Sequence, residues 1–173
     1  MTHKQHYKNY TMYIASCDKE GGIYRYILHP DGSAEPMDKM PLDRPMYMVM
    51  SEKRMHVLLQ SPFDQSPDSG YTCLEANAGG ELGKPDVIIS TKGQVACHLA
   101  VANEVYCANY TSGSVIKLSD QLVVHQGSSI HPERQTAPHP HQVVFTPDGN
   151  FLCVPDLGMD EILIYDQHLN PIS

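Results

Sequence analysis

Short apolar runs separated by polar turns recur along the whole chain. Near its C-terminal end, Gln142 to Thr146 forms one run, Pro147-Asp148-Gly149-Asn150 is a tight turn, and Phe151 to Val154 is a second run. A polar turn over residues 156–160 leads to a third run, Glu161-Ile162-Leu163-Ile164-Tyr165. Runs of this length between turns rich in Pro, Asp and Gly are typical of β-strands. The segment therefore predicts three antiparallel strands in a meander.

The same unit is repeated upstream. The earlier runs cover residues 11–15 and 23–28, then 46–50, 55–59 and 71–74, and then 96–101, 105–110 and 114–118. The first runs of the last three units start near residues 46, 97 and 141, at offsets of 51 and 44 residues. Weaker fourth runs lie at 86–90 and 122–125. A period of about 40–50 residues is that of a four-stranded propeller blade.

The repeats predict an all-β chain with the fold of a partial β-propeller. If the blade strands are labelled A to D from the axis outward, the chain reads BCD, ABCD, ABCD, ABC. We expect a single domain over residues 1–173, with blades at roughly 10–40, 45–90, 96–126 and 141–173. These three and a half blades cannot close into a ring, and closure is how propellers protect their sheet edges. We therefore expect the N-terminal half of a longer protein, whose exposed blades are covered by the missing C-terminal half or by self-association.

Composition and charge narrow the class of protein. A hydrophobic share of 41% suits a globular core, and a net charge of -8 argues against a general nucleic-acid or anionic-membrane surface. The polar stretch Met1 to Asn9 lacks the apolar core of a secretory signal. No apolar run approaches the roughly 20 residues of a membrane span. We expect a cytoplasmic protein, because no secretory signal is evident. We also expect no bound metal, because no two cysteines have the spacing of a zinc site.

Blade topology predicts where a ligand binds. Consecutive strands of a blade are antiparallel, so the D-to-A and B-to-C connections lie on one face, and propellers commonly bind ligands where such connections converge. The residues entering strand A or leaving strand B on this face are Cys17, Asp18, Asp43, Arg44, Tyr47, Cys97, His98, Asn109, Tyr110, Glu133, Arg134, His139, His141 and Asp156. From this set we predict substrate contacts for Arg44, His98, Asn109, His139 and Asp156.

The longest connection, Ser128 to Pro140, carries the candidate chemistry. With His141 directly after it, this loop brings together three histidines, Glu133 and Arg134. Long loops without secondary structure of their own are often functional. An imidazole exchanges protons near neutral pH, and a guanidinium can hold a carboxylate or phosphate. The combination suits hydrolysis or rearrangement of a small anionic substrate.

Several motifs resemble one known family. The runs Pro132-Glu133-Arg134-Gln135, Pro138-His139-Pro140-His141, Val154-Pro155-Asp156-Leu157-Gly158 and Ile164-Tyr165-Asp166 are similar to those of the lactonase family of seven-bladed propellers. Cys97-His98-Leu99 and Ala108-Asn109-Tyr110-Thr111-Ser112-Gly113-Ser114 match the preceding blade of that family, and Ala15-Ser16 with Gly21-Gly22-Ile23-Tyr24 matches its opening. The family includes propeller-type 6-phosphogluconolactonases and fungal carboxy-cis,cis-muconate lactonising enzymes, which are about twice this length.

The resemblance implies a lactone hydrolase that needs no cofactor and acts on a small anionic lactone or sugar acid. The leading expectation is hydrolysis of 6-phosphogluconolactone to 6-phosphogluconate, a step of the pentose phosphate pathway in carbohydrate metabolism. A muconate-type lactonising isomerase is the alternative within the family. Because half of the pocket residues are expected elsewhere, the fragment alone is expected to be inactive, and the residues do not define the lactone or the direction of reaction.

The family pattern assigns catalytic roles residue by residue. The second histidine of its Pro-His-x-His motif falls on His141, and its Glu-Arg pair falls on Glu133 and Arg134. His141 is then the general base on water, and Arg134 holds the substrate anion or the developing oxyanion.

Other interpretations of the same residues remain open. His141 could cap the start of an inner strand, Glu133 and Arg134 could form a surface ion pair, and Asn109 and Asp156 could bond local backbone before their turns. Zinc binding by the loop histidines is disfavoured because prolines separate them. At the level of function, a non-catalytic binding scaffold and a redox or sensor propeller are rivals. The chain has no Trp to supply an aromatic cofactor platform.

Overall fold

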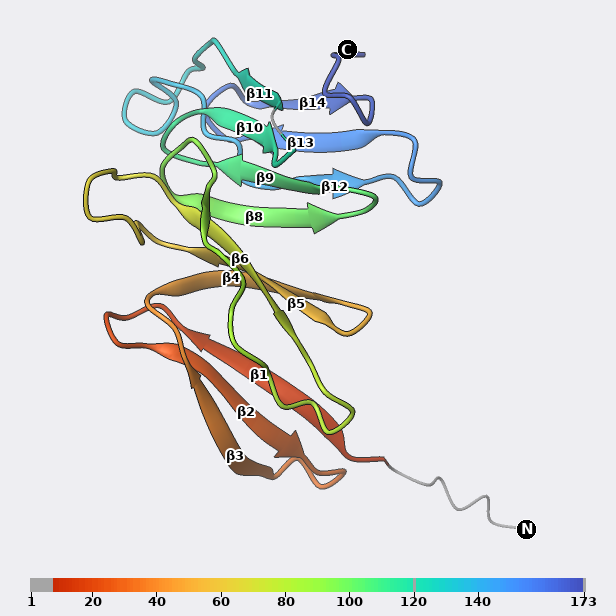
Figure 1. Cartoon of the computed structure of the whole chain (residues 1–173). Coiled ribbons are helices and arrows are strands. Elements are labelled where there is room, and N and C mark those ends of the chain that lie inside the picture. The colour runs from red at the N-terminus through yellow and green to blue at the C-terminus, as the bar shows by residue number, and fades with distance from the viewer. Residues whose placement is uncertain (1–7, 120, 173) are drawn as a thin grey trace.

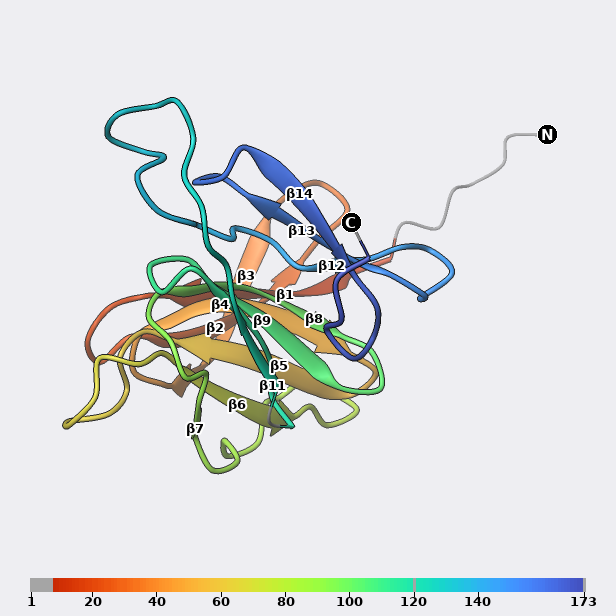
Figure 2. The same cartoon turned by 90° about the horizontal axis from the view of Figure 1, so that it is seen from above.

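The computed structural model describes residues 8–119 and 121–172 (Figures 1 and 2). Of the polar stretch Met1 to Asn9, residues 1–7 lie outside the described part, as do residues 120 and 173 of the expected third and fourth blades. The described residues contain 14 strands and no helix. They therefore contain no helix that is long and apolar enough to cross a membrane.

The strands form four antiparallel sheets. The first holds β1 (Tyr10–Ser16), β2 (Gly22–Leu28) and β3 (Ala34–Pro41), and the second holds β4 (Pro45–Ser51), β5 (Arg54–Leu59), β6 (Gly70–Glu75) and β7 (Ile89–Ser90). The third holds β8 (Ala96–Val101), β9 (Val105–Asn109), β10 (Ser114–Lys117) and β11 (Gln121–Val124), and the fourth holds β12 (Val144–Phe145), β13 (Leu152–Asp156) and β14 (Glu161–Tyr165). Each sheet is a meander, and the sheets follow one another along the molecule (Figure 1). The prediction of an all-β, partial propeller is confirmed, whereas the limits of a single domain stay a prediction.

The direction of β3 shows which strands the first sheet contains. Only residues 42–44 separate β3 from β4. Three residues reach about 10 Å, whereas a strand of seven residues rises roughly 23 Å. The connection therefore cannot return along the sheet, and β4 starts at the end where β3 stops. This is the geometry of a D-to-A connection, so the first sheet consists of strands B, C and D, as the repeat pattern predicts.

The sheets are held together by side chains that alternate between their two flanks. On β5, Met55, Val57 and Leu59 belong to a buried cluster with Ile23 of the first sheet, whereas Leu58 belongs to a cluster with residues of the third. A central strand of a blade is covered on both flanks, and for this reason β5 is apolar at successive positions. The third and fourth sheets meet in a further cluster that includes Ala108, Val115, Val143, Leu152 and Val154.

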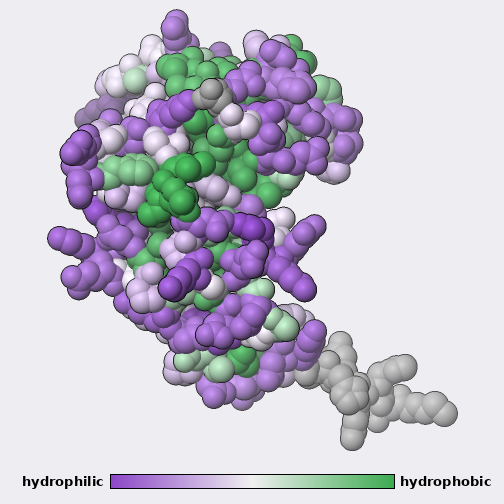
Figure 3. Space-filling view, viewed as in Figure 1, coloured by the Kyte–Doolittle hydropathy of each residue, from purple (hydrophilic) through white to green (hydrophobic). Residues whose placement is uncertain are grey.

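The outer flank of the fourth sheet has no neighbouring sheet within the described residues. Pairing of β12, β13 and β14 places five apolar side chains on this flank, namely Val144, Cys153, Pro155, Ile162 and Ile164. Val144 is 42% exposed and Ile162 is 63% exposed. Figure 3 shows further apolar side chains at the surface over the part of the molecule that contains β8 to β14. Coverage by additional blades or by a second copy stays a prediction.

Candidate functional site

The connections predicted to share one face are tied to each other by backbone hydrogen bonds. Arg44 N–H, between β3 and β4, donates to Asp18 O between β1 and β2 at 3.0 Å, and Gln60 N–H donates to Arg44 O at 3.0 Å. Leu157 N–H, after β13, donates to His139 O before β12 at 3.0 Å. These loops gather on the left-hand side of Figure 1. The D-to-A and B-to-C connections therefore lie on one side of the molecule, which is called the rim below.

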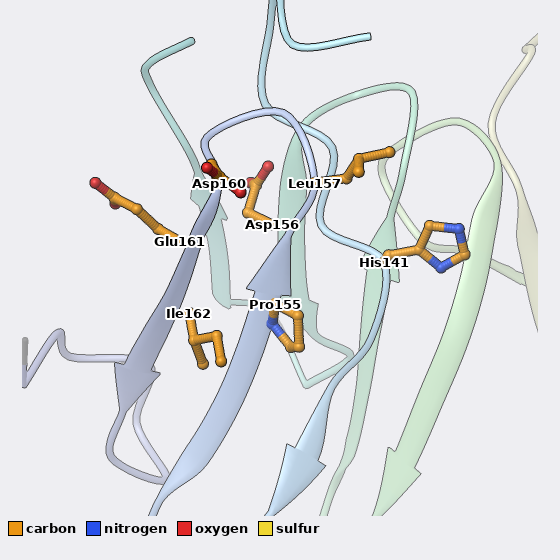
Figure 4. Close-up of a pocket in the computed structure, with 7 residues that line it drawn as sticks. All are labelled: His141, Pro155, Asp156, Leu157, Asp160, Glu161 and Ile162. Atoms are coloured by element: carbon orange, nitrogen blue, oxygen red, sulfur yellow. The ribbon is translucent and has the colours of Figure 1, made fainter. Parts of the chain in front are cut away.

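A pocket of about 510 Å³ lies on this rim at the fourth sheet (Figure 4). It is lined by His141, Pro155, Asp156, Leu157, Asp160, Glu161 and Ile162. The carboxylates lie on one side, and His141 lies on the other with its ring turned away from them (Figure 4). His141 therefore borders the pocket with its ring directed away from the acidic groups, and an anionic ligand needs positive charge from outside this lining.

His141 is an exposed side chain fixed mainly through its backbone. Its N–H donates to Pro155 O at 3.0 Å, and its carbonyl oxygen accepts a hydrogen bond from the Cys97 thiol at 3.4 Å. Its ring meets the ring of Tyr110 edge-on, with centroids 5.2 Å apart. Within the described residues, no hydrogen bond occupies either ring nitrogen. The backbone therefore positions the imidazole, and both ring nitrogens stay available to bind a ligand or exchange a proton, as a general base requires.

His139 is held more firmly than His141. Its ring stacks on Tyr110 at a centroid distance of 4.5 Å, and its Nδ1–H donates to the Tyr110 carbonyl oxygen at 3.0 Å. Its backbone N–H donates to Asp156 Oδ1 at 2.6 Å. Tyr110 thus supports both histidines of the Pro-His-Pro-His segment, which places the sequence-predicted His139 and His141 side by side on one aromatic ring.

Asp156 lies in a buried polar network. Its Oδ2 pairs with His125 Nδ1 at 2.6 Å, and His125 Nε2 lies 3.0 Å from the Tyr165 hydroxyl. Its Oδ1 accepts hydrogen bonds from the backbone N–H groups of Gly158 at 2.9 Å and Met159 at 3.2 Å. The interpretation in which Asp156 bonds local backbone is confirmed. Since its side chain is fully buried against His125, its predicted contact with substrate stays a prediction.

The network lowers the pKa of Asp156. Burial acts to raise this pKa, but hydrogen bonds from His125 and from the backbone N–H groups of His139 and Met159 outweigh burial. The aspartate is therefore ionised at neutral pH and holds the loop that carries the candidate histidines. Sequence reasoning missed His125, because an isolated histidine at the end of an outer strand carries no local sign of a partner 31 residues away.

His98 lies on β8 and joins three innermost strands. Its Nε2 is 2.9 Å from the Tyr47 hydroxyl on β4, and its Nδ1 accepts a long hydrogen bond of 3.5 Å from Val143 N–H, just before β12. Burial, and secondarily the nearby His141, lower the pKa of His98. The structure thus brings His98 close to His141, as the topology predicts, and leaves its imidazole neutral at pH 7.

The other two predicted substrate contacts are already engaged within the protein. Arg44, with a positive φ of 46°, pairs with Asp43 at 2.8 Å, so its charge is largely compensated. Asn109 is fully buried and its Nδ2 donates to Thr91 O at 3.0 Å and Ser114 Oγ at 3.1 Å. For both residues a role in substrate binding stays a prediction.

Glu133 and Arg134 lie in the long connection that extends beyond the end of the sheets in Figure 2. Both are exposed, and their backbone N–H groups donate to His131 Nδ1 at 3.3 and 3.1 Å. The buried Gln135 anchors this loop by donating to Leu157 O at 3.0 Å. No ion pair between Glu133 and Arg134, and no hydrogen bond of either with His141, occurs in the described part. Their shared catalytic role stays a prediction.

No group of three or more metal-binding side chains is arranged to hold an ion in residues 8–119 and 121–172. The expected absence of a metal and of a cofactor stays a prediction. All five cysteines are free thiols, and Cys73 and Cys107 are buried.

We predict that Gly158→Ala displaces the Pro-His-Pro-His segment. An added Cβ would lie 1.8 Å from Ala137 O and 2.9 Å from His139 N, both backbone atoms that cannot move aside independently. Gly79→Ala is the matched control, because its nearest contact would be an ordinary 3.4 Å. We expect about 1–3 kcal/mol of destabilisation for Gly158→Ala alone, measured by urea unfolding. Equal stability of the two variants would contradict this close approach.

Comparison with known proteins is consistent with this architecture. Residues 11–171 match the family described as lactonase, 7-bladed beta-propeller. The structure of a candidate 6-phosphogluconolactonase from Bacteroides fragilis aligns with a TM-score of 0.80 and 26% identity, covering 94% of this chain and 49% of that one. A second such structure, from Bacteroides uniformis, aligns with a TM-score of 0.80 and 25% identity, covering 94% of this chain and 52% of that one.

Relatives from Staphylococcus aureus are similar over the same range. An uncharacterized protein of strain N315 is 26% identical over 172 residues, which cover 88% of this chain and 49% of the relative. The chain thus spans about half the length of the curated relatives that it matches.

The stacked meanders and the polar rim formed by their connections define a β-propeller protein. The chain belongs to the lactonase family of seven-bladed β-propellers.

Proposed function

We propose that the gene product containing this chain hydrolyses a small lactone, with 6-phosphogluconolactone as the leading substrate. The observation that carries the proposal is the exposed His141 imidazole, which is held by its backbone at a pocket of the rim in a protein of the lactonase family. The two Bacteroides structures described as candidate 6-phosphogluconolactonases support the choice of substrate.

In the proposed reaction, His141 removes a proton from water as the oxygen attacks the lactone carbonyl carbon. The carbonyl electrons move onto oxygen and form a tetrahedral oxyanion. When the carbonyl re-forms, the ring C–O bond breaks, and the proton returns from the imidazole to the departing alkoxide. The product is a hydroxy acid, which ionises at neutral pH. Only proton transfers and one ester-type bond change are needed, so the reaction requires no redox cofactor.

The electrostatics of the site set a condition on the substrate. Asp160 and Glu161 line the pocket with exposed side chains, so a phosphate group is repelled there unless a cation approaches. Arg134 is the candidate within this chain, because its exposed guanidinium forms no ion pair with any described residue and it lies in the connection that leads to His141. We propose that the substrate phosphate binds toward Arg134 and that the lactone ring binds toward His141.

We predict that the full-length gene product accelerates the opening of 6-phosphogluconolactone. The measurement couples the 6-phosphogluconate formed to its dehydrogenase and subtracts the spontaneous rate. The 173-residue chain is assayed in parallel, and we expect it to be inactive. No acceleration in the full-length product would contradict the proposed substrate. Hydrolysis of δ-gluconolactone, which lacks the phosphate, at an equal kcat/KM would contradict the role of Arg134.

We propose the cytoplasm as the location, since 6-phosphogluconolactone is a charged intracellular metabolite.

A further inference from the structure

A chain of hydrogen bonds crosses the innermost strands of three successive sheets. Tyr47 on β4 and His98 on β8 are joined by the 2.9 Å contact between the Tyr47 hydroxyl and His98 Nε2. Val143, just before β12, donates its backbone N–H to His98 Nδ1 at 3.5 Å. The rings of Tyr47 and His98 are tilted by 34° relative to each other, and their centroids are 4.5 Å apart. Tyr47 and His98 therefore form a fixed unit at the inner edge of the sheets.

The long 3.5 Å bond from the backbone donor indicates one tautomer of His98. A neutral imidazole has one N–H donor and one acceptor nitrogen, and a backbone N–H can only donate. Nδ1 is therefore the acceptor, and Nε2 carries the hydrogen that is donated to the Tyr47 oxygen. His98 is neutral because burial and the nearby His141 lower its pKa. It follows that the hydroxyl hydrogen of Tyr47 is not used in this bond.

The hydroxyl hydrogen of Tyr47 is left for a ligand. Among residues 8–119 and 121–172, the only hydrogen bond of the Tyr47 hydroxyl is the one to His98. Its ring is half-buried and packs against a cluster that includes Leu58, Ala96 and Leu99, which fixes the direction of the C–O bond. Burial also raises the pKa of Tyr47, so the phenol stays protonated at neutral pH. A rigid, protonated donor without an internal acceptor is thus held against His98, whose pKa is lowered in part by the nearby His141.

We propose that Tyr47 is a catalytic residue whose hydroxyl donates a hydrogen bond to the carbonyl oxygen of the substrate, with His98 as its positioning residue. This proposal rests on the proposed lactone hydrolysis. As water attacks the carbonyl carbon and His141 takes its proton, negative charge develops on the carbonyl oxygen, and the Tyr47 hydrogen bond shortens without transfer of its proton. The bond lengthens again when the carbonyl re-forms and the ring C–O bond breaks. Fixed donors aimed at such an oxyanion act mainly on kcat.

The tautomer is tested without any activity measurement. In the 173-residue chain labelled with ¹⁵N-histidine, long-range ¹H–¹⁵N spectra distinguish the two ring nitrogens, and the His98→Gln variant identifies the signals of His98. We expect a protonated Nε2 and an unprotonated Nδ1 at pH 7.5. A protonated Nδ1 would mean that Tyr47 donates to His98, and the proposal would then fail whatever the function of the protein.

The catalytic role is tested by Tyr47→Phe in the full-length gene product. This change removes only the hydroxyl and retains the ring. Tyr71→Phe is the matched control, because the Tyr71 hydroxyl also bonds a histidine, His56 Nδ1 at 2.7 Å, but on strands farther from the axis. We expect kcat for 6-phosphogluconolactone to fall about a hundredfold in Tyr47→Phe, with KM changed less than threefold and Tyr71→Phe at the wild-type rate.

The outcomes separate this role from the proposed function. A Tyr47→Phe variant with wild-type kcat contradicts the role of Tyr47 alone. A wild-type protein that hydrolyses no lactone contradicts both proposals. An equal loss in the Tyr47→Phe and Tyr71→Phe variants would show a general structural effect and would also overturn the role. Thermal unfolding followed by circular dichroism verifies that the variants are folded.

Discussion

His141→Ala in the full-length gene product is expected to lower kcat for lactone hydrolysis by about 10²–10⁴-fold, the usual contribution of a positioned general base. Stability should change little, because the ring of His141 is exposed and accepts or donates no hydrogen bond within the described residues. The main-chain bonds that fix this residue, to Pro155 O and from the Cys97 thiol, do not depend on its side chain. The measurement is the steady-state rate with 6-phosphogluconolactone, corrected for spontaneous opening.

Chemical rescue distinguishes a base from a support for the loop. The alanine leaves open space where the ring was, so added imidazole should restore part of the lost rate in a concentration-dependent manner. His168→Gln is the control, because His168 is also exposed but lies in the turn after β14. A His141→Ala variant with the wild-type rate would contradict the general-base assignment. A loss of rate without any rescue would favour a structural role for the imidazole.

The repeat pattern predicted the architecture well because each blade is a local meander. Alternation of apolar positions and turns rich in Pro, Asp and Gly depends only on neighbouring residues, and the four sheets contain the expected 3, 4, 4 and 3 strands. The shortest strands were predicted too long. β7 is only Ile89–Ser90, because Asp86 upstream takes part in an irregular pairing, in which its N–H donates to Cys73 O and its carbonyl accepts from Thr72 Oγ1.

The candidate site was predicted less completely than the fold. Topology correctly placed the Pro-His-Pro-His segment on the rim with Tyr110, since residues that enter strand A and leave strand B share that face. The partners of Asp156 and His98 were not found, because the contacts to His125 and Tyr47 span 31 and 51 residues. Which side chains meet across two blades depends on how the sheets pack, and no pattern along the chain encodes this.

Asp156→Ala is expected to destabilise the folded chain by about 3–5 kcal/mol, the usual effect of removing the charged partner from a buried hydrogen-bonded pair. The side chains of Asp156 and His125 are 0% and 1% exposed. Without the carboxylate, His125 and the backbone N–H groups of His139 and Gly158 lose their acceptor in a site that water does not reach. The free energy of unfolding, measured in urea at pH 7, provides the test.

Asp156→Asn should cost clearly less than Asp156→Ala. Its amide oxygen can still accept from the backbone N–H groups, and its NH₂ can donate to His125 Nδ1 if the imidazole moves its hydrogen to Nε2, next to the Tyr165 hydroxyl. Asp148→Asn is the control, because Asp148 also accepts hydrogen bonds within a turn but is exposed. Equal losses for Asp156→Ala and Asp156→Asn would show that charge, not the hydrogen-bond geometry, supports the segment.

The stability contributed by Asp156 should also depend on pH. The pKa of Asp156 is lower in the folded chain than in the unfolded chain, where an aspartate titrates at about 3.9. The unfolded chain therefore binds more protons as the pH falls, so this stability is complete above about pH 5 and declines as the pH falls toward the folded-state pKa. The difference in unfolding free energy between wild type and Asp156→Asn should thus shrink as the pH falls below about pH 4. A difference that grows on acidification would mean that the pKa of the Asp156 carboxyl group is raised, not lowered, in the folded protein.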